Sequence, residues 1–300
     1  MLLLPCSLRP AFQLTPHAGR YRGPRYLRVF YINLDHRTDR RDYMEAQFEA
    51  IGLRAERFRA ATPADVTAAD LAPVTAEEAR RCLTPTEIAT SVSHQRVWRR
   101  MIEDGHGHAL VLEDDCELSP QIPAFLAEFD RQGGASGLVR LETRSRSQIL
   151  ARRASRMVRG VGLHQPYTWE WGSAAYIISA DEARRVLGSP HRFRAPVDDM
   201  LLSPSSPMRV SSSLLQAVPA LAFVPEENVA EGSQPATVRQ SDMQDERLRR
   251  FKEEKPKVKV RKLAREIRRI QRQITDIRRI LRDRVFGRTM VVPFARDPAV

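Results

Sequence analysis

The apolar run Ala109-Leu110-Val111-Leu112, followed at once by Glu113-Asp114-Asp115, is the feature that most constrains the fold of this chain. Apolar residues without alternation are typical of a strand buried on both faces, as in the largely parallel sheets of α/β proteins. Open sheets of this kind bind ligands beyond the carboxyl ends of their strands. The sequence therefore predicts that these carboxylates lie at a ligand-binding edge of a buried sheet.

Strand and helix patterns alternate along the chain, which favours an α/β sandwich. Two helix starts carry capping boxes, one from Thr84 to Glu87 and one from Ser179 to Glu182. The basic, weakly patterned stretch 144–159 is expected to be a mobile loop or a short helix. The expected strands cover 29–34, 109–112, 138–142 and 173–178, and the expected helices cover 39–51, 85–104 and 180–187.

The positive charge of the chain is concentrated near its C-terminus. The 300 residues carry a net charge of +12, and the segment 246–284 alone holds 17 Lys and Arg against 6 Asp and Glu. The rest of the chain is therefore close to neutral. The expected organisation is a poorly ordered extension (1–26), a main domain (27–229), a linker (230–245), a basic amphipathic helix (246–286) and a tail (287–300).

Cysteine usage and hydropathy restrict the cellular setting. The three cysteines form neither a CxxC pair nor an even framework, so that neither a disulfide scaffold nor a zinc site is supported. No apolar run reaches the roughly 18 residues of a spanning helix. The apolar start is too short for a secretory signal. We expect a cytoplasmic protein that could also attach peripherally to the inner face of the membrane.

The basic C-terminal segment has an apolar stripe. Leu263, Ile267, Ile270, Ile274, Ile277 and Leu281 recur at alternating steps of four and three, as in a coiled coil. Three interpretations compete, namely a self-association seam, a helix on an anionic membrane and a phosphate-binding surface. We favour the membrane surface or self-association through 257–284. Nucleic acid is disfavoured, because the segment has no recognition module and no interleaved aromatic residues.

The acidic triplet is suited to a divalent cation. Neighbouring carboxylates repel one another and raise each other's pKa unless a cation neutralises them. Mg²⁺ and Mn²⁺ prefer oxygen ligands of this kind, and such an ion can bridge the diphosphate of a nucleotide donor. The alternative interpretation is a solvated acidic loop after a strand.

Several stretches share an order and spacing that resembles glycosyltransferase family 25, the lipooligosaccharide galactosyltransferase type. They span residues 29 to about 226. The stretches are Tyr31-Ile32-Asn33-Leu34 with Asp39-Arg40-Arg41, Ser93-His94 with Trp98, Val111 to Asp115, Val139 to Thr143, Trp171 to Ser179, and Pro196-Val197-Asp198.

The resemblance implies a GT-A-like nucleotide-sugar-binding sandwich with a mostly parallel central sheet. It also implies inversion at the anomeric carbon and transfer of a hexose, commonly galactose from UDP-galactose, to a surface glycolipid or other glycan. GT-A folds carry an Asp-x-Asp motif whose last Asp contacts Mn²⁺ or Mg²⁺. Here Glu113-Asp114-Asp115 would supply that motif, with Asp115 as the principal ligand and Glu113 as its assistant.

Inversion by direct displacement requires a base near the acceptor hydroxyl, because its proton leaves as the glycosidic bond forms. Asp198 is the first candidate, since its segment resembles a late acidic motif of the family, and Asp199 and Glu142 are reserves. The alternative for Asp198 is an N-cap aspartate of a helix that begins at Asp199.

Candidates for donor binding follow the first strand and lie on two later segments. Arg40 and Arg41 stand near a helix N-terminus, where guanidinium groups can meet a diphosphate. His94 lies on a polar helix face and could bind a sugar or a phosphate, or simply fill a polar seam. Gly172 allows a close ligand approach, and the neighbouring Trp169 and Trp171 could stack on a sugar or belong to the core. The full set of expected donor-binding residues is Asn33, Leu34, Arg40, Arg41, His94 and Gly172.

Two other function classes remain open. One is a non-catalytic scaffold, associated with a membrane or nucleic acid, in which the glycosyltransferase-like domain is inactive. The other is a Mg²⁺-dependent phosphohydrolase, which would release phosphate without glycosyl transfer. Metal-dependent stabilisation by UDP-sugars separates the enzyme from the scaffold.

Overall fold

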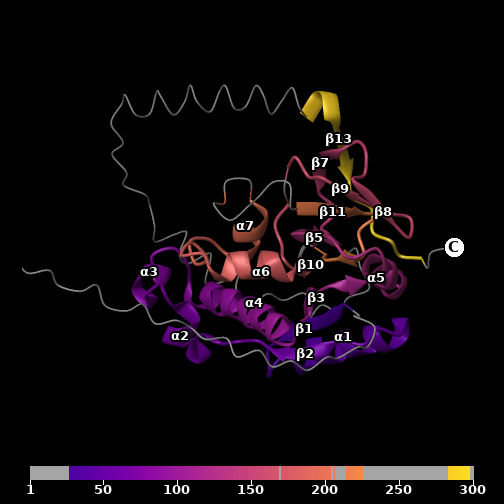
Figure 1. Cartoon of the computed structure of the whole chain (residues 1–300). Helices are drawn as coiled ribbons and strands as arrows, with labels where there is room; N and C mark the ends of the chain where they lie inside the picture. The colour runs from indigo at the N-terminus through magenta and orange to yellow at the C-terminus, as the bar shows by residue number, and fades with distance from the viewer. Residues whose placement is uncertain (1–26, 169, 204–205, 207–213, 226–282, 298–300) are drawn as a thin grey trace, which may run out of the picture.

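The computed structural model describes residues 27–168, 170–203, 206, 214–225 and 283–297 (Figure 1). Its centre is an eight-stranded sheet with the order β2-β1-β3-β10-β5-β11-β9-β8. The strands are β1 (Arg28–Asn33), β2 (Glu56–Arg59), β3 (His108–Glu113), β5 (Leu138–Arg140), β8 (Arg156–Val158), β9 (Val161–His164), β10 (Ala175–Ser179) and β11 (Leu214–Val218).

The sheet is mixed, with most strands pointing one way. β1 pairs in parallel with both β2 and β3, and β11 pairs in parallel with β5. β10 runs antiparallel between β3 and β5, and β9 runs antiparallel to β8 and β11. Six of the eight strands therefore share a direction, which confirms the expected α/β class with a mostly parallel central sheet.

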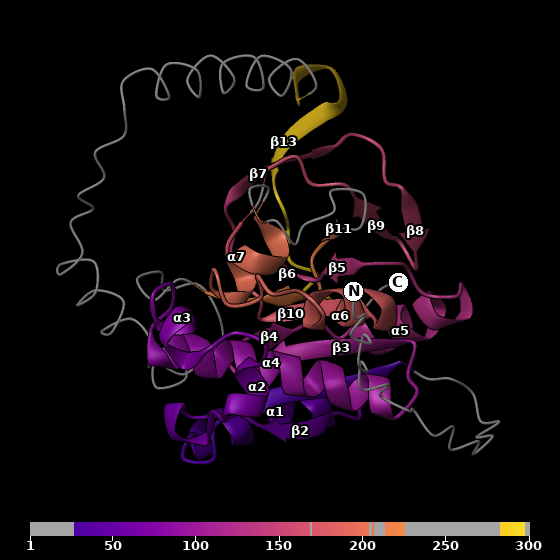
Figure 2. The same ribbon diagram turned by 60° about the vertical axis from the view of Figure 1, so that its left-hand side comes forward.

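Helices cover both faces of this sheet, as Figures 1 and 2 show. α1 (Thr38–Ile51) and α5 (Ile122–Arg131) share one apolar core with the strands. α4 (Pro85–Glu103), α6 (Ala180–Leu187) and α7 (Val197–Leu202) share the other. Three short helices, η1 (Pro63–Asp65), α2 (Ala68–Leu71) and α3 (Ala76–Arg80), precede α4. The result is a three-layer α/β/α arrangement.

The acidic triplet follows a strand that is buried on both faces, as predicted. Leu110 and Leu112 of β3 belong to the core under α1 and α5, whereas Ala109 and Val111 belong to the core under α4 and α6. All four are fully buried. Each large apolar side chain contributes roughly 1.5–3 kcal/mol by its burial, so the position of the strand and of its acidic tip is strongly fixed.

Both predicted helix starts are confirmed. Thr84 caps α4 with a complete capping box, in which its hydroxyl accepts from the Glu87 N–H and the Glu87 carboxylate accepts from the Thr84 N–H. Ser179 caps α6 by accepting from the Glu182 N–H. The Glu182 carboxylate pairs with Arg185 instead of completing a capping box.

The stretch 144–159 is not the expected loop or short helix. It contains β7 (Ser147–Ala151) and the edge strand β8. The expected strand 138–142 also breaks at Leu141 into β5 and β6 (Glu142–Thr143). β6 joins a small second sheet with β12 (Ala222–Phe223) and β4 (Glu117–Leu118). These strands form through pairing with distant segments, which local sequence patterns do not report.

A strand from the far end of the chain packs on the main domain. β13 (Gly287–Val291), within the expected tail, pairs antiparallel with β7. The next residues continue the contact, because the Val292 carbonyl accepts from the Thr143 hydroxyl and the Pro293 carbonyl from the Ala220 N–H. The expected extension 1–26, the linker 230–245 and most of the basic helix 246–286 lie outside the described residues. The domain division stays a prediction.

Within the described ranges, no helix combines the length and the apolar character that crossing a bilayer would need.

Candidate active site at the carboxyl ends of β1 and β3

The tips of three neighbouring strands bring the candidate residues together. β1 and β3 lie side by side in register, with Ile32 opposite Glu113. The segment before β10 reaches the same edge, because the Glu113 N–H donates to the Ala174 carbonyl at 2.8 Å. The parallel direction of β1 and β3 therefore places Asn33 beside the acidic triplet.

Asp114 points into the protein. One of its oxygens accepts from Asn33 Nδ2 at 2.7 Å, and the other accepts from Arg40 Nη1 at 2.8 Å. Burial raises the pKa of the Asp114 carboxyl, although Arg40 and Asn33 act in the opposite direction. Both carboxylate oxygens are thus committed to neighbours, and Asp114, Asn33 and Arg40 together lock the turn that carries the triplet.

Glu113 is held in its ionised form. Its Oε1 accepts from the Ser173 hydroxyl at 2.7 Å and lies 3.3 Å from His94 Nε2. Burial works against ionisation, but these two contacts outweigh it and lower the pKa of Glu113. The side chain keeps 24% of its surface exposed. Glu113 therefore presents a fixed negative charge at the strand tip.

His94 supports Glu113 from within the core. Its side chain is fully buried, and its Nδ1 lies 2.8 Å from the Tyr176 hydroxyl, which also accepts from Trp98 Nε1 at 2.9 Å. A fully buried ring has no surface with which to contact a donor. Any role of His94 in binding thus acts through Glu113.

Asp115 is half-buried beside these groups. Burial and the adjacent negative charge of Glu113 raise the pKa of Asp115, and Arg40 only partly offsets them. The carboxylates of Asp115 and Glu113 repel each other, and a cation bound between them would relieve that repulsion.

Glu142 anchors the turn opposite the triplet. It is fully buried, and its Oε1 accepts from Arg140 Nη2 at 2.8 Å while its Oε2 accepts from the Ala174 N–H at 2.8 Å. Arg140 also donates to Glu170 at 3.2 Å. Glu142 therefore fixes the backbone before β10, and both of its oxygens are occupied.

Gly172 has a backbone conformation that only glycine adopts readily. Its φ is +111°, and an added Cβ would lie 2.4 Å from Glu142 Oε1. Its N–H donates to Asp198 Oδ2 at 3.2 Å. Asp198 lies in the first turn of α7, which begins at Val197 after Pro196, so Asp198 is not the N-cap of that helix. Asp198 is thus oriented toward the Gly172 turn.

Three other expected site residues have different surroundings. Arg41 lies on α1 and approaches Asp42 at 3.6 Å. Leu34 packs against the core under α4 and α6. Asp199 is half-buried on α7, where its carbonyl accepts from the Ser203 N–H. None of these observations connects the three residues to the strand-tip carboxylates.

Arg144 is the site residue that the sequence interpretation missed. Its guanidinium lies beside Glu142 at the Gly172 turn, and the negative charges of Glu142, Asp115, Glu113 and Glu170 act on it. The one available signal was its position just after a strand, at the same edge of the fold as the triplet. Arg144 and Arg140 thus provide two positive charges near the four carboxylates of Glu113, Asp115, Glu142 and Glu170.

The site offers two carboxylates suited to a metal ion. Within the described part of the chain, no group of three or more His, Cys, Asp or Glu side chains forms a ligand cluster. Mg²⁺ is commonly held by one or two carboxylates, with substrate phosphates and waters completing its shell. Asp115 and Glu113 match that mode, whereas Asp114 does not, because both of its oxygens are bonded.

An exposed aromatic side chain stands next to the Gly172 turn. Trp171 is 56% exposed, and the guanidinium of Arg146 stacks over its ring at 5.3 Å. The backbone carbonyl of Trp171 accepts from Arg140 Nη2 at 2.9 Å. The other expected aromatic residue, Trp169, lies outside the described residues.

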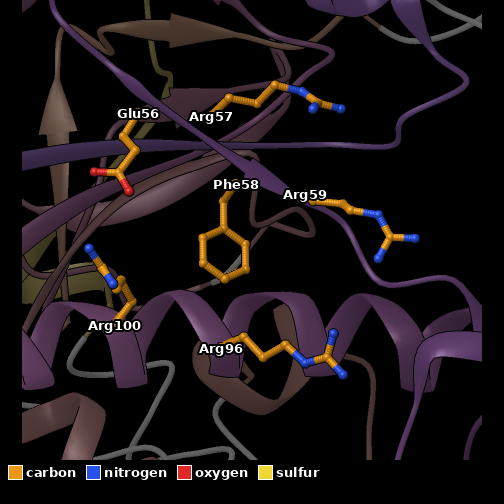
Figure 3. A pocket seen from close by; sticks show the side chains of 6 residues that line it. All are labelled: Glu56, Arg57, Phe58, Arg59, Arg96 and Arg100. Atoms are coloured by element: carbon orange, nitrogen blue, oxygen red, sulfur yellow. The ribbon is translucent and has the colours of Figure 1, made fainter.

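A concavity of about 450 Å³ lies away from these residues, between β2 and α4. Figure 3 shows Phe58 at its centre with arginines around it. These arginines are neutralised locally, because Arg57 and Arg59 pair with Asp35, Arg96 pairs with Asp70, and Arg100 pairs with Asp104. The basic appearance of this groove therefore does not indicate an anion site.

Comparison with known proteins places the strand-tip site in a family context. The profile described as Glycosyltransferase family 25 (LPS biosynthesis protein) matches residues 27–201. This range contains β1, β3, β10, the acidic triplet and Asp198.

Three relatives illustrate the similarity. A Glycosyltransferase 25 family member of Drosophila melanogaster is 28% identical over 189 residues, covering 58% of this chain and 30% of the relative. The Lacto-N-neotetraose biosynthesis glycosyltransferase LgtE of Neisseria meningitidis serogroup B is 29% identical over 165 residues, covering 51% and 57%. Human Procollagen galactosyltransferase 2 is 26% identical over 183 residues, covering 58% and 29%. The chain thus spans less than two thirds of the length of each of these relatives.

Proposed function

Because the chain belongs to glycosyltransferase family 25, we propose that it transfers a hexose from a nucleotide-sugar donor to a glycan acceptor. We propose galactose from UDP-galactose as the donor sugar and a cell-surface glycolipid as the acceptor. The names of the Neisseria and human relatives support this choice, since one belongs to oligosaccharide biosynthesis and the other is a galactosyltransferase.

One observation carries the proposal. Glu113 and Asp115 at the tip of a buried strand share an edge of the sheet with the Gly172 turn, and that turn holds Asp198. Carboxylates that would hold a divalent cation for the donor diphosphate, and a separate carboxylate that can act as a base toward the acceptor hydroxyl, are suited to an inverting transfer. We further propose a GT-A-like arrangement of this domain.

Metal dependence is part of the proposal. Asp115 and Glu113 would hold Mn²⁺ or Mg²⁺, which when bound supplies Lewis-acid stabilisation of the departing diphosphate. The protein keeps Glu113 ready for the ion, because Ser173 and His94 hold its carboxylate ionised. Asn33 and Arg40 bind Asp114 and so fix the backbone between them.

Asp198 is the proposed base. The acceptor hydroxyl oxygen forms a bond to the anomeric carbon, the bond from that carbon to the diphosphate breaks, and the hydroxyl proton passes to the Asp198 carboxylate. The Gly172 N–H donates to Asp198 Oδ2 and orients the carboxylate for this transfer. Glu142 is less suited, because it is fully buried with both oxygens bonded.

The test compares Asp115→Asn and Asp198→Asn with wild type in transfer of radiolabelled galactose from UDP-galactose to a panel of terminal-sugar acceptors, with and without Mn²⁺. We expect each variant to lose at least about 100-fold in rate, the lower end of what positioned acid–base and electrostatic groups contribute. Asp181→Asn is the matched control, since Asp181 is an exposed aspartate at 97% side-chain exposure on α6.

Each outcome separates the function classes. Phosphate release without transfer would indicate a phosphohydrolase. A protein that neither transfers sugar nor is stabilised by UDP-galactose with Mn²⁺ would be a scaffold. Full activity of folded Asp115→Asn would overturn the metal role assigned here.

We also propose a cytoplasmic location with peripheral attachment to the inner face of the membrane. The support is the basic, striped segment 257–284, whose structure lies almost wholly outside the described residues. Co-sedimentation of the full chain with anionic and with neutral lipid vesicles tests attachment. Equal sedimentation with both kinds of vesicle would refute an electrostatic contact.

A further inference from the structure

Arg144 has a hydrogen-bonding capacity that its surroundings leave unused. Its Nε is buried and has no hydrogen-bond partner among the residues that the structure describes. The nearby carboxylates of Glu142 and Glu170 form their ion pairs with Arg140. A buried polar group without a partner is costly, and its presence in a folded protein calls for an explanation such as a catalytic role or a bound ion.

The guanidinium lies directly against the Gly172 turn. An added Cβ on Gly172 would lie 2.7 Å from Arg144 Nε and 2.9 Å from Nη2. The absence of a side chain at Gly172 therefore leaves room for the guanidinium beside Glu142. The turn that orients Asp198 and the cation at the acidic tip are parts of one packed unit.

Arg144 stays charged in these surroundings. A guanidinium keeps its charge in proteins, and the negative charges of Glu142, Asp115 and Glu113 favour that charge here. The site thus contains a permanent cation next to the two carboxylates assigned to the metal. A guanidinium is well suited to phosphate groups, because its planar N–H donors can form paired hydrogen bonds with phosphate oxygens.

The other arginines near the triplet are committed to carboxylates. Arg40 donates to Asp114 at 2.8 Å, and Arg140 donates to both Glu142 and Glu170. Arg41 lies on the surface of α1 with Asp42. Arg144 is therefore the arginine of this edge whose geometry best fits an incoming anion.

We propose that Arg144 binds the diphosphate of the nucleotide-sugar donor and is thus a further catalytic residue of this site. The inference rests on the proposed function. As the bond from the anomeric carbon to the diphosphate oxygen breaks, its electron pair moves to that oxygen. The N–H groups of Arg144 stabilise the negative charge that develops there.

The experiment measures binding of inorganic pyrophosphate, UDP and uridine to the full chain by calorimetry, in the presence of Mg²⁺. Arg144→Gln should weaken pyrophosphate and UDP by about 10- to 100-fold, the range expected for loss of charge-assisted hydrogen bonds. Binding of uridine, which has no phosphate, should not change. Arg144→Lys keeps the charge without the paired donors and should show a smaller loss. Arg153→Gln, an exposed position of the same basic stretch, is the matched control and should bind all three as wild type.

Unchanged pyrophosphate and UDP binding in Arg144→Gln would overturn the inference. A parallel loss of uridine would do the same, since it would indicate a structural role. If Arg144→Gln fails to fold, Arg144→Lys decides by the same comparison of pyrophosphate with uridine. Suppose that Arg144→Gln weakens pyrophosphate binding but that the wild-type protein transfers no galactose. This result would refute the proposed function and leave the role of Arg144 in anion binding intact. Wild type that transfers galactose while the variants bind pyrophosphate normally would refute only the role of Arg144.

Discussion

Replacement of Gly172 by alanine should disrupt the site and destabilise the domain together. The new Cβ would lie 2.4 Å from Glu142 Oε1 and 2.7 Å from Arg144 Nε, well inside contact distance. Glu142 cannot move away cheaply, because it is fully buried and bonded to Arg140 and to the Ala174 N–H. Overpacking of this kind costs roughly 1–3 kcal/mol. The positive φ of +111° adds about 1–2 kcal/mol for a residue with a side chain.

Gly160 provides a matched control. It also has a positive φ, of +80°, but an added Cβ there meets no atom within 4 Å. Gly160→Ala should therefore cost only the backbone strain, about 1–2 kcal/mol. Urea unfolding of the two variants measures both costs, and the difference between them isolates the contact with Glu142 and Arg144.

Activity adds a second readout. Gly172→Ala should reduce galactosyl transfer strongly even in conditions where it remains folded, because Asp198 and Arg144 both depend on this turn. Gly160→Ala should retain transfer. Equal losses of unfolding free energy in the two variants, with transfer intact in both, would refute the packing described for the Gly172 turn.

Two further predictions concern buried ion pairs. Asp114→Ala should destabilise the fold by about 3–5 kcal/mol in urea unfolding, because it removes the carboxylate that Arg40 and Asn33 contact inside the protein; a loss below about 1 kcal/mol would contradict the structural role of Asp114. Arg96 holds the pKa of Asp70 well below its usual range. Since the unfolded chain binds the proton more readily, the stability contributed by Asp70 is present above about pH 4 and is lost as the pH falls toward the lowered pKa. The unfolding free energy should thus change less between pH 7 and pH 3 in Asp70→Asn than in wild type. An equal change in both proteins would argue against a stabilising Asp70–Arg96 ion pair.

Local signals in the sequence determined much of the framework. The capping residues Thr84 and Ser179 predicted two helix starts correctly, because capping is decided within four consecutive residues. The apolar run of β3 predicted a strand buried on both faces, and its acidic end predicted the sheet edge at which the candidate residues lie. The family profile, which covers 27–201, agrees with the resemblance seen in the sequence.

Strand pairing between distant segments could not be predicted from local sequence patterns. β7 looked like a basic loop, yet it forms a strand because β13, from beyond residue 286, supplies its partner. The break at Leu141 likewise depends on β12, which pairs with β6. Local propensity is a weak guide where a non-local partner decides the conformation.

The roles of the individual charged residues were decided only by the tertiary structure. The sequence placed three carboxylates in a row, but packing turned Asp114 inward to Arg40 and left Asp115 half-buried at the tip. It also buried His94 behind Glu113 and brought Arg144 to the acidic edge. The sequence specifies which groups are available, whereas burial and distance, which depend on the packing of segments far apart in the chain, decide which of them can meet a substrate.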